Sequence, residues 1–127
     1  MKKQKTERQK LVKKLDDIFS LYIRTRDKRS VFSGSSENLQ CFHIFSRVSY
    51  GTRWEEWNAF AATSAENIKY EYDTYFINHV HNWYIGRFGK PMFEMMNRKY
   101  YGITKFSNAD LKMLIEHFKN KLEALGK

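Results

Sequence analysis

The sequence contains one cysteine, one proline and no long apolar run in its 127 residues, and these shortages exclude several classes of protein. The single thiol, Cys41, cannot form an intramolecular disulfide, which argues against a disulfide-stabilised secreted domain. The lack of a long apolar run and of a signal-peptide pattern argues against a membrane protein. We therefore expect a soluble, cytoplasmic protein without a membrane partner, in which Cys41 is a buried structural side chain rather than a nucleophile.

Acidic residues are also few, with 14 Asp and Glu against 23 Lys and Arg, which gives a net charge of +9 and a pI near 9.7. Residues 1–29 hold 11 of the basic residues and only 4 of the acidic ones. This asymmetry predicts salt-sensitive binding to nucleic acid. For residues 1–10, a basic tail, two interpretations stay open: contact with nucleic acid, or a solvated and disordered segment.

Aromatic residues, in contrast, make up 17% of a chain that is 42% hydrophobic, which is enough for the core of a single domain over residues 11–127. Apolar spacing and capping signals predict an α+β, mostly helical fold with a small β-hairpin. The predicted elements are a helix over 9–27, strands over 30–32 and 39–44 joined by a turn at 34–38, an irregular loop over 45–61, a helix that starts after Asn58 or near Ser64, helices over 74–88 and 92–101, and a helix of about 16 residues after Ser107 that packs against the first.

The segment 39–58, LQCFHIFSRVSYGTRWEEWN, carries the residue types that phosphodiester chemistry uses. His43 can take a proton from water near neutral pH, and Arg47 and Arg53 can bind phosphate oxygens. The amide of Asn58 can hold the imidazole or its loop in place. Ordinary roles stay open as well: a core histidine at His43, surface ion pairs at the two arginines, and a helix cap at Asn58.

In order and spacing, these motifs resemble those of the HNH (ββα-metal) endonucleases of phages, in particular recombination endonucleases of the NinG/Rap type. The matching residues are Ile23-Arg24-Thr25-Arg26-Asp27, His43 with Arg47, Thr52-Arg53-Trp54 with Asn58, Asn67 with Glu71, and Trp83-Tyr84 with Gly89. The resemblance covers roughly residues 10–100. It implies an HNH-like ββα core flanked by N-terminal and C-terminal helices, a phage origin, and a location in the cytoplasm of the host cell.

The sequence departs from this family at the positions that hold metal. The register places Ser30, Ser33, Thr63 and Glu66 where the four cysteines of two zinc knuckles stand, and Tyr70 in place of the last histidine. Hydroxyl groups do not ionise near neutral pH, so we expect no structural zinc. Aromatic side chains are expected to fill the space around the former zinc position: Phe32, Phe42, Phe45, Trp54, Trp57, Phe60 and Tyr70.

DNA contacts are expected from the basic residues of the first helix and of the histidine segment, namely Lys13, Lys14, Arg24, Arg26, Arg47 and Arg53. Glu71 and Asp73 are candidate ligands for Mg²⁺ or Mn²⁺ near His43, because these cations prefer carboxylate oxygens. His79 and His81 are two residues apart on a predicted helix and point in different directions, so they do not form a chelating pair.

Three hypotheses about function follow. The first is a zinc-free DNA-binding protein of HNH descent whose nuclease activity is weak or lost, and it is favoured because five metal-site positions have changed together. The second is an active endonuclease that uses Mg²⁺ or Mn²⁺ on branched or single-stranded DNA, with His43 as general base and Asn58 orienting the attacking water. The third is an interaction module that binds a phage or host protein through exposed aromatic side chains.

Overall fold

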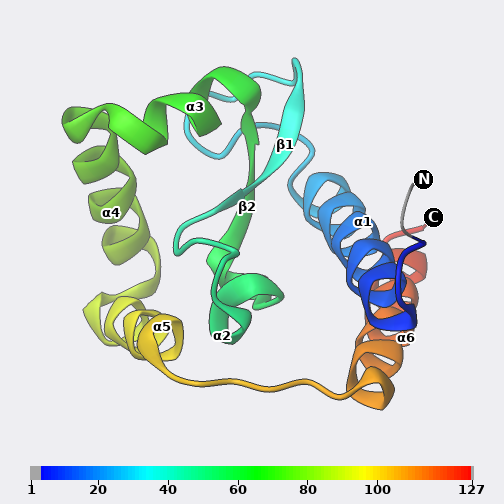
Figure 1. Ribbon diagram of the computed structural model, residues 1–127. Helices are drawn as coiled ribbons and strands as arrows, with labels where there is room; N and C mark the ends of the chain where they lie inside the picture. The colour runs from blue at the N-terminus through cyan, green and yellow to red at the C-terminus, as the bar shows by residue number, and fades with distance from the viewer. Residues whose placement is uncertain (1–3, 127) are drawn as a thin grey trace.

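The computed structural model describes residues 4–126 and is a mostly helical α+β structure, as predicted (Figure 1). In the described residues, no helix offers an apolar stretch of the length that crossing a bilayer needs. The elements in chain order are α1 (Glu7–Asp27), β1 (Leu39–His43), α2 (Tyr50–Arg53), the 3₁₀ turn η1 (Glu56–Asn58), β2 (Ala59–Thr63), α3 (Ser64–Tyr72), α4 (Thr74–Phe88), α5 (Lys90–Tyr101) and α6 (Asn108–Ala124).

Strands β1 and β2 form a two-stranded antiparallel sheet with Phe42 opposite Phe60 (Figure 1). Because successive side chains of a strand point to opposite faces, the two faces of this sheet differ. Phe42 and Phe60 pack in a core cluster with buried residues of α4 and α5. Cys41 and Ala59 contact a second cluster, which α1 and α6 contribute. His43 lies two residues after Cys41 and therefore on the face of the sheet that α1 covers.

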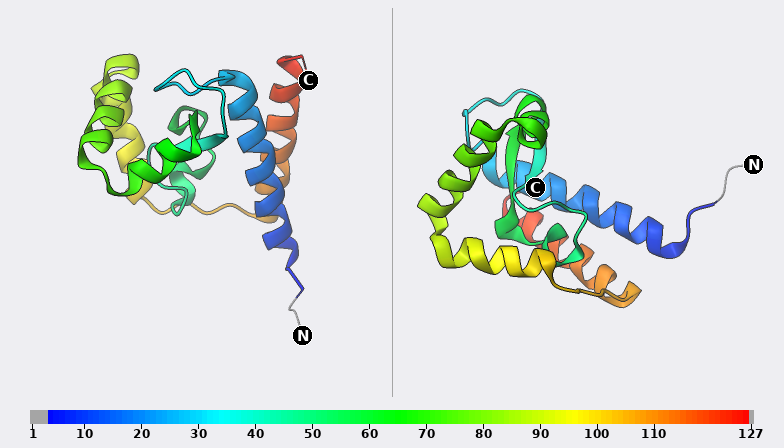
Figure 2. Two further views of the ribbon diagram at one scale, coloured as in Figure 1. Left: turned by 90° about the horizontal axis from the view of Figure 1, so that it is seen from above. Right: turned by 60° about the vertical axis from the view of Figure 1, so that its left-hand side comes forward.

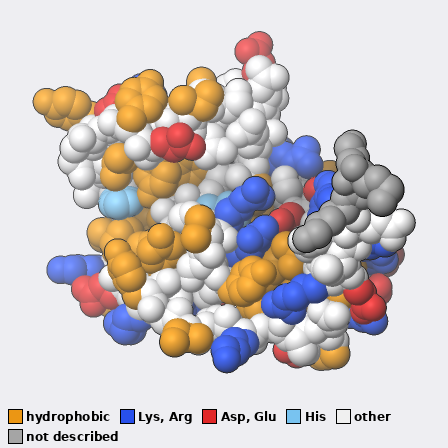
Figure 3. Space-filling model, viewed as in Figure 1, with side chains coloured by type: hydrophobic (Ala, Val, Ile, Leu, Met, Phe, Trp, Pro, Cys, Tyr) orange, Lys and Arg blue, Asp and Glu red, His pale blue; other side chains and the backbone are white. Residues whose placement is uncertain are grey.

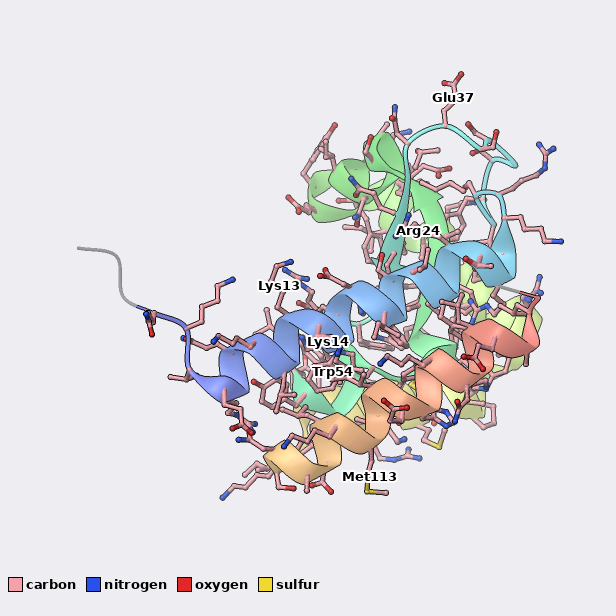
Figure 4. The ribbon with its side chains drawn as sticks, turned by 90° about the vertical axis from the view of Figure 1, so that its right-hand side faces the viewer. Lys13, Lys14, Arg24, Glu37, Trp54 and Met113 are labelled. Atoms are coloured by element: carbon pink, nitrogen blue, oxygen red, sulfur yellow. The ribbon has the colours of Figure 1, made fainter. Side chains whose placement is uncertain are left out.

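Helices α1 and α6 lie side by side and run in the same direction, as Figures 2 and 4 show. An ion pair of 3.4 Å between Glu7 and Lys112 joins their first turns. The rings of Phe19 and Phe118 meet edge to face in their shared core, with centroids 4.9 Å apart. The predicted packing of the last helix against the first is thereby confirmed, and an extended connection after α5 brings the chain to the start of α6 (Figure 1).

The free edge of β2 is closed by two side chains from the end of α1 rather than by a third strand. Nη2 of Arg26 donates to the carbonyl of Ala59 at 2.8 Å, and Asp27 accepts from the amide of Ala61 at 2.8 Å. Arg26 and Asp27 also bind each other, with an N–O distance of 2.8 Å. These bonds satisfy backbone groups that a sheet edge would otherwise leave open.

The prediction of a strand over 30–32 is wrong, and this segment makes a single backbone hydrogen bond to β2. The amide of Val31 donates to the carbonyl of Ala61 at 3.0 Å. The Oγ of Ser30 then accepts from the amides of Phe32 and Ser33, both at 3.1 Å, and bends the chain into a turn. A serine side chain that bonds the next amides competes with a strand ladder in this way.

The predicted irregular loop over 45–61 is also wrong at its end, because β2 begins at Ala59 and is the actual partner of β1. Alanine is a weak strand former, so the sequence AFAAT carries little strand signal. Burial decides the structure here, since Ala59, Ala61 and Ala62 are fully enclosed. The small side chains of Ala59 and Ala61 let α1 pack close to the sheet, whereas Phe60 fills the opposite core.

Capping residues set the helix starts. The predicted helix over 74–88 is confirmed as α4, and α6 begins after Ser107 as predicted, with a capping box between Ser107 and Asp110. The start of α3 directly after Thr63 agrees with one of the two predicted starts. Helices α1 and α5 each begin two residues earlier than predicted, α1 because Thr6 forms a capping box with Gln9. The basic segment 1–10 is therefore helical from Glu7 onward, and its residues 1–3 lie outside the described residues.

The four residues at the expected zinc positions lie together in a hydrogen-bonded cluster. Oε1 of Glu66 accepts from the Ser30 hydroxyl at 2.7 Å and from the Thr63 amide at 2.8 Å. The Thr63 hydroxyl in turn caps the amide of Glu66 at 3.2 Å, and the Ser33 amide donates to Ser30. This donor set does not suit zinc, but it joins the turn after α1 to the start of α3.

The aromatic residues expected around this position divide between two places. Five of them belong to the core cluster between the sheet, α4 and α5: Phe32, Phe42, Phe45, Phe60 and Tyr70. The expectation is wrong for Trp54, whose indole N–H donates to Asp16 of α1 at 2.9 Å and which packs in the other cluster. It is also wrong for Trp57, which is 44% exposed beside the Arg26 guanidinium.

The carboxylate of Glu66 predicts a measurable pH dependence of stability. Burial raises the pKa of Glu66, but the hydrogen bonds from Thr63, Ser30 and Ser33 outweigh it and hold the pKa below its usual value. A lowered carboxyl pKa stabilises the fold above the unfolded-state value of about 4.3, and this stability is lost as the pH falls through the folded-state pKa. We expect Glu66→Gln to lower the free energy of unfolding by about 1 kcal/mol at pH 7 and by less below about pH 4.

Urea denaturation at several pH values measures this difference. Glu94→Gln, at an exposed position on α5, is the control and should change stability little. A Glu66→Gln effect that is equal at pH 7 and pH 3 would contradict the assignment.

Candidate functional site

An open cleft with a volume of about 720 Å³ lies where α1, β1 and the loop after β1 meet α3. His43, Arg24, Arg47 and Glu71 all line it, so the structure brings together four residues that the sequence analysis selected. Figure 3 shows Lys and Arg side chains gathered over the region where the sheet meets α1, with acidic side chains between them. The remaining polar or acidic lining residues were not predicted as site residues: Asp16, Asp17, Ser20, Gln40, Ser46 and Asn67.

The imidazole of His43 is held in one orientation by the loop that follows it. Nε2 of His43 lies 2.9 Å from the carbonyl oxygen of Arg53. A carbonyl only accepts hydrogen bonds, so Nε2 carries the proton and Nδ1 of the neutral ring keeps its lone pair. Burial lowers the pKa of His43, and the charge of Arg47 adds to this, against the raising effect of the bond to Arg53. The ring is therefore neutral at pH 7, with a nitrogen that can accept a proton.

Asn58 holds the loop between the two strands and does not reach the cleft. Its side chain is fully enclosed. Nδ2 donates to the carbonyls of Phe45 and Thr52 at 2.8 and 2.9 Å, and Oδ1 accepts from the amide of Phe45 at 2.8 Å. An enclosed amide with these backbone partners cannot orient a water molecule in the cleft. Its role is to position the loop, and through the loop the carbonyl that binds His43.

Arg53 binds a carboxylate of α1. Nε and Nη2 of Arg53 donate to the two oxygens of Asp16 at 3.0 and 2.6 Å, and the indole of Trp54 donates to the same carboxylate. The Arg53 side chain is 18% exposed and lies over the Trp54 ring at 5.4 Å. This two-point bond joins the loop to α1 and leaves Arg53 few donors for a phosphate.

The other basic residues predicted to contact DNA differ in their exposure and in whether their side chains are already bonded. Arg47 is 63% exposed and only 3.9 Å from Asp16, and Arg24 lines the cleft with Nε bonded to Ser20. Lys13 and Arg24 are three helical turns apart and point to the same side of α1, whereas Lys14 leaves the helix elsewhere (Figure 4). Lys14 is exposed and outside the cleft lining. Arg26, bound to β2, is not free to contact DNA.

Tyr70, expected from the resemblance at the position of the last HNH histidine, packs in the core. Its ring packs on Phe42 with centroids 4.7 Å apart. Its hydroxyl donates to the carbonyl of Ile44 at 2.7 Å and lies 2.8 Å from Nε2 of His81. Burial raises the pKa of Tyr70 and lowers that of His81, so both groups are neutral at pH 7.

The carboxylates proposed as metal ligands are not brought together. Glu71 lines the cleft, but Asp73 caps α4 by accepting from the amide of Phe76 at 3.1 Å. In the described part of the chain, no three His, Cys, Asp or Glu side chains converge as a metal site. Cys41 also lines the cleft, and burial raises the pKa of its thiol to about 12, which keeps it protonated and unreactive at neutral pH.

Asp16 was missed because its role depends on a tertiary contact, whereas Asp17 pairs with Lys13, four residues before it on the same helix. Asp17, Ser20 and Arg24 recur at helical spacing, which is a signal that they share one face of α1. The bond between Asp16 and Arg53 joins residues 37 positions apart in sequence, and no local sequence pattern predicts it.

Comparison of the chain with protein-family models, with curated proteins and with solved structures gives no match. The interpretation of the cleft therefore rests on its geometry and on the chemistry of its residues.

The role of Asn58 predicts a large loss of stability on truncation. Asn58→Ala removes hydrogen bonds to enclosed backbone groups of the loop, so the free energy of unfolding should fall by about 3 kcal/mol. Urea denaturation measures the fall, and amide exchange at Phe45 should become faster. Asn97→Ala, on the exposed side of α5, is the matched control. Equal stabilities of the two variants would contradict the role given to Asn58.

Proposed function

We propose that this protein binds DNA through the His43 cleft, on a scaffold of phage HNH recombination-endonuclease descent, and that its phosphodiester hydrolysis is weak or lost. The observation that carries the proposal is the convergence of Arg24, Arg47 and neutral His43 in one open cleft. Arginine side chains bind phosphate oxygens at two points. The neutral ring of His43 adds no charge to the cleft, and its Nε2 proton is already bound to the Arg53 carbonyl, so the two arginines supply the phosphate contacts.

The acidic residues of the cleft do not cancel this attraction. Asp16 is bound by Arg53, and Asp17 pairs with Lys13 at 3.0 Å. A carboxylate that is already paired repels an incoming phosphate less than a free one. Glu71 remains as an exposed negative charge at one wall, so the cleft accommodates a backbone that follows the α1 side.

The order of elements supports HNH descent. A strand that ends at His43, a long loop, a second strand and then a helix make the ββα order that the resemblance implies, although β2 is not the strand predicted from sequence. The clustering of Ser30, Ser33, Thr63 and Glu66 adds support. These four residues come from two segments 30 positions apart in sequence, and the zinc-knuckle register requires that they meet.

Weak or lost catalysis is supported by what stands at the metal positions. Phe42 and Tyr70 pack on each other, and the Tyr70 hydroxyl already binds a backbone carbonyl. Hard divalent cations prefer several carboxylate or carbonyl oxygens, and the proposed Glu71 and Asp73 pair does not supply them at one point.

One observation favours the second candidate, an active endonuclease. A general base needs a free lone pair, and the bond from Nε2 of His43 to the Arg53 carbonyl leaves that lone pair on Nδ1. In that case His43 would take a proton from water while Arg47 holds the phosphate, and a Mg²⁺ or Mn²⁺ ion would supply charge stabilisation of the leaving oxygen.

Binding is tested with labelled duplex, single-stranded and four-way-junction DNA at several salt concentrations. Arg24→Ala with Arg47→Ala should weaken binding at least about tenfold near 0.1 M salt and lower the salt slope by about 2, because two phosphate contacts are lost. Lys112→Ala with Lys119→Ala, on exposed positions of α6, changes the net charge equally and should have little effect. Equal losses in the two double variants would count against the cleft.

Hydrolysis is tested with the same DNA in Mg²⁺ or Mn²⁺. We expect binding without cleavage. His43→Gln keeps a donor for the Arg53 carbonyl and removes the basic nitrogen, so cleavage that disappears in this variant would establish the active nuclease instead. Neither binding nor cleavage would favour the third hypothesis, a protein partner, whose contact surface would include Tyr72 and Tyr75, 71% and 90% exposed.

A further inference from the structure

A second groove, with a volume of about 1060 Å³, runs along the first half of α1. It is formed by the residues before and within the first three turns of α1, together with Tyr50 and Arg53 of α2. It shares Asp16, Asp17 and Arg47 with the His43 cleft, so the two hollows meet. We call it the Arg8 groove after one of its lining residues.

Positive charge is concentrated in the Arg8 groove rather than in the His43 cleft. The groove is lined by five basic and two acidic residues, whereas the cleft is lined by two basic and three acidic ones. Both acidic residues of the groove are paired, Asp16 with Arg53 and Asp17 with Lys13. A site that binds a polyanion places its basic side chains along the path of the phosphates. The basic lining residues of the groove are Lys5, Arg8, Lys13, Arg47 and Arg53.

The groove has an aromatic wall that holds one of its guanidinium groups in place. The ring of Tyr50 stacks on Trp54, with centroids 5.5 Å apart. The guanidinium of Arg8 lies 5.7 Å from the Tyr50 centroid, and its Nη1 donates to the carbonyl of Phe106 at 2.7 Å. Arg8 is thereby fixed in position, and the donors that these contacts leave unused are available to a phosphate.

The two hollows together match the length of a nucleic-acid strand. Arg8 and Arg24 are about 160° apart around α1, so a strand that contacts both passes around the helix as well as along it. They are 16 residues apart in sequence, which corresponds to about 24 Å along the helix axis at about 1.5 Å per residue. One strand of B-DNA carries a phosphate about every 3.4 Å along the axis, so about seven phosphates fit this distance. Arg47, shared by both hollows, stands between the two ends.

We infer that the DNA strand held in the His43 cleft continues into the Arg8 groove, so that a single backbone of about seven phosphates is bound along α1. This inference rests on the proposed function and adds to it an extended binding path and a minimum ligand length. The chemistry recognised is the phosphodiester backbone itself. A duplex and a single strand both supply it, and the experiment distinguishes them.

The test uses Lys5→Ala with Arg8→Ala in the full chain, with duplex and single-stranded DNA of about 4 and about 12 nucleotides. Loss of two phosphate contacts should lower the salt slope by about 1.8 for a duplex or about 1.4 for a single strand. The longer DNA should bind the wild-type protein more tightly than the shorter one, and this advantage should shrink in the variant. The DNA form that shows both effects is the one that occupies the groove.

Arg8→Lys separates charge from structure, because it keeps the positive charge and loses the fixed geometry of the guanidinium. Arg8→Lys should retain the wild-type salt slope. If its slope is instead lowered as in the double variant, the effect of Arg8 is on the stability of the fold and not on phosphate binding. The control is again Lys112→Ala with Lys119→Ala. If Lys5→Ala with Arg8→Ala behaves like this control while Arg24→Ala with Arg47→Ala still weakens binding, the Arg8 groove is not part of the DNA path and the proposal for the His43 cleft is unaffected. If the wild-type protein binds no DNA at low salt, both fail.

Discussion

The enclosed amide of Asn58 is the constraint on which the site depends. By binding both backbone groups of Phe45 and the carbonyl of Thr52, it fixes the loop that leaves β1 and returns to β2. The loop then presents the Arg53 carbonyl to His43 and the Arg53 side chain to Asp16 on α1. Asn58 thus helps to position the loop whose Arg53 carbonyl binds Nε2 of His43 and whose Arg53 side chain binds α1. A polar group this deeply enclosed is tolerated only because its bonds are made.

Two further groups of polar side chains join elements of the fold through hydrogen bonds. Glu66, bound by Ser30 and Thr63, joins the turn after α1 to α3. Arg26 and Asp27 satisfy the edge of β2 in place of a third strand. Each such bond stabilises the fold by about 1 kcal/mol, which is far less than a structural zinc ion contributes. The aromatic core on the other face of the sheet therefore contributes more to stability than these bonds do, since each enclosed ring contributes about 2–3 kcal/mol.

The helices could be predicted from the sequence because their signals are local. A cap such as that of Ser107, and the spacing of apolar residues on one helix face, both involve residues only a few positions apart in sequence. Strand β2 could not be predicted, because its alanines favour a strand only when α1 and the aromatic core enclose them. For the site, local reasoning found His43, Arg24 and Arg47 but could not tell which arginines are free. Arg26 binds Ala59 and Arg53 binds Asp16, each more than 30 positions away in sequence, so these bonds are seen only in the folded chain.

The most direct measurement of the central claim is an NMR titration of isotope-labelled protein with a short DNA duplex at low salt. The account predicts that resonances of the His43 ring, the Arg24 and Arg47 side chains and the loop around Ser46 shift together and recover on addition of salt. It also predicts that the exposed aromatic residues of α3 and α4 stay unchanged. Shifts confined to those aromatic residues, or no shifts at any DNA concentration, would contradict the assignment of the cleft to DNA.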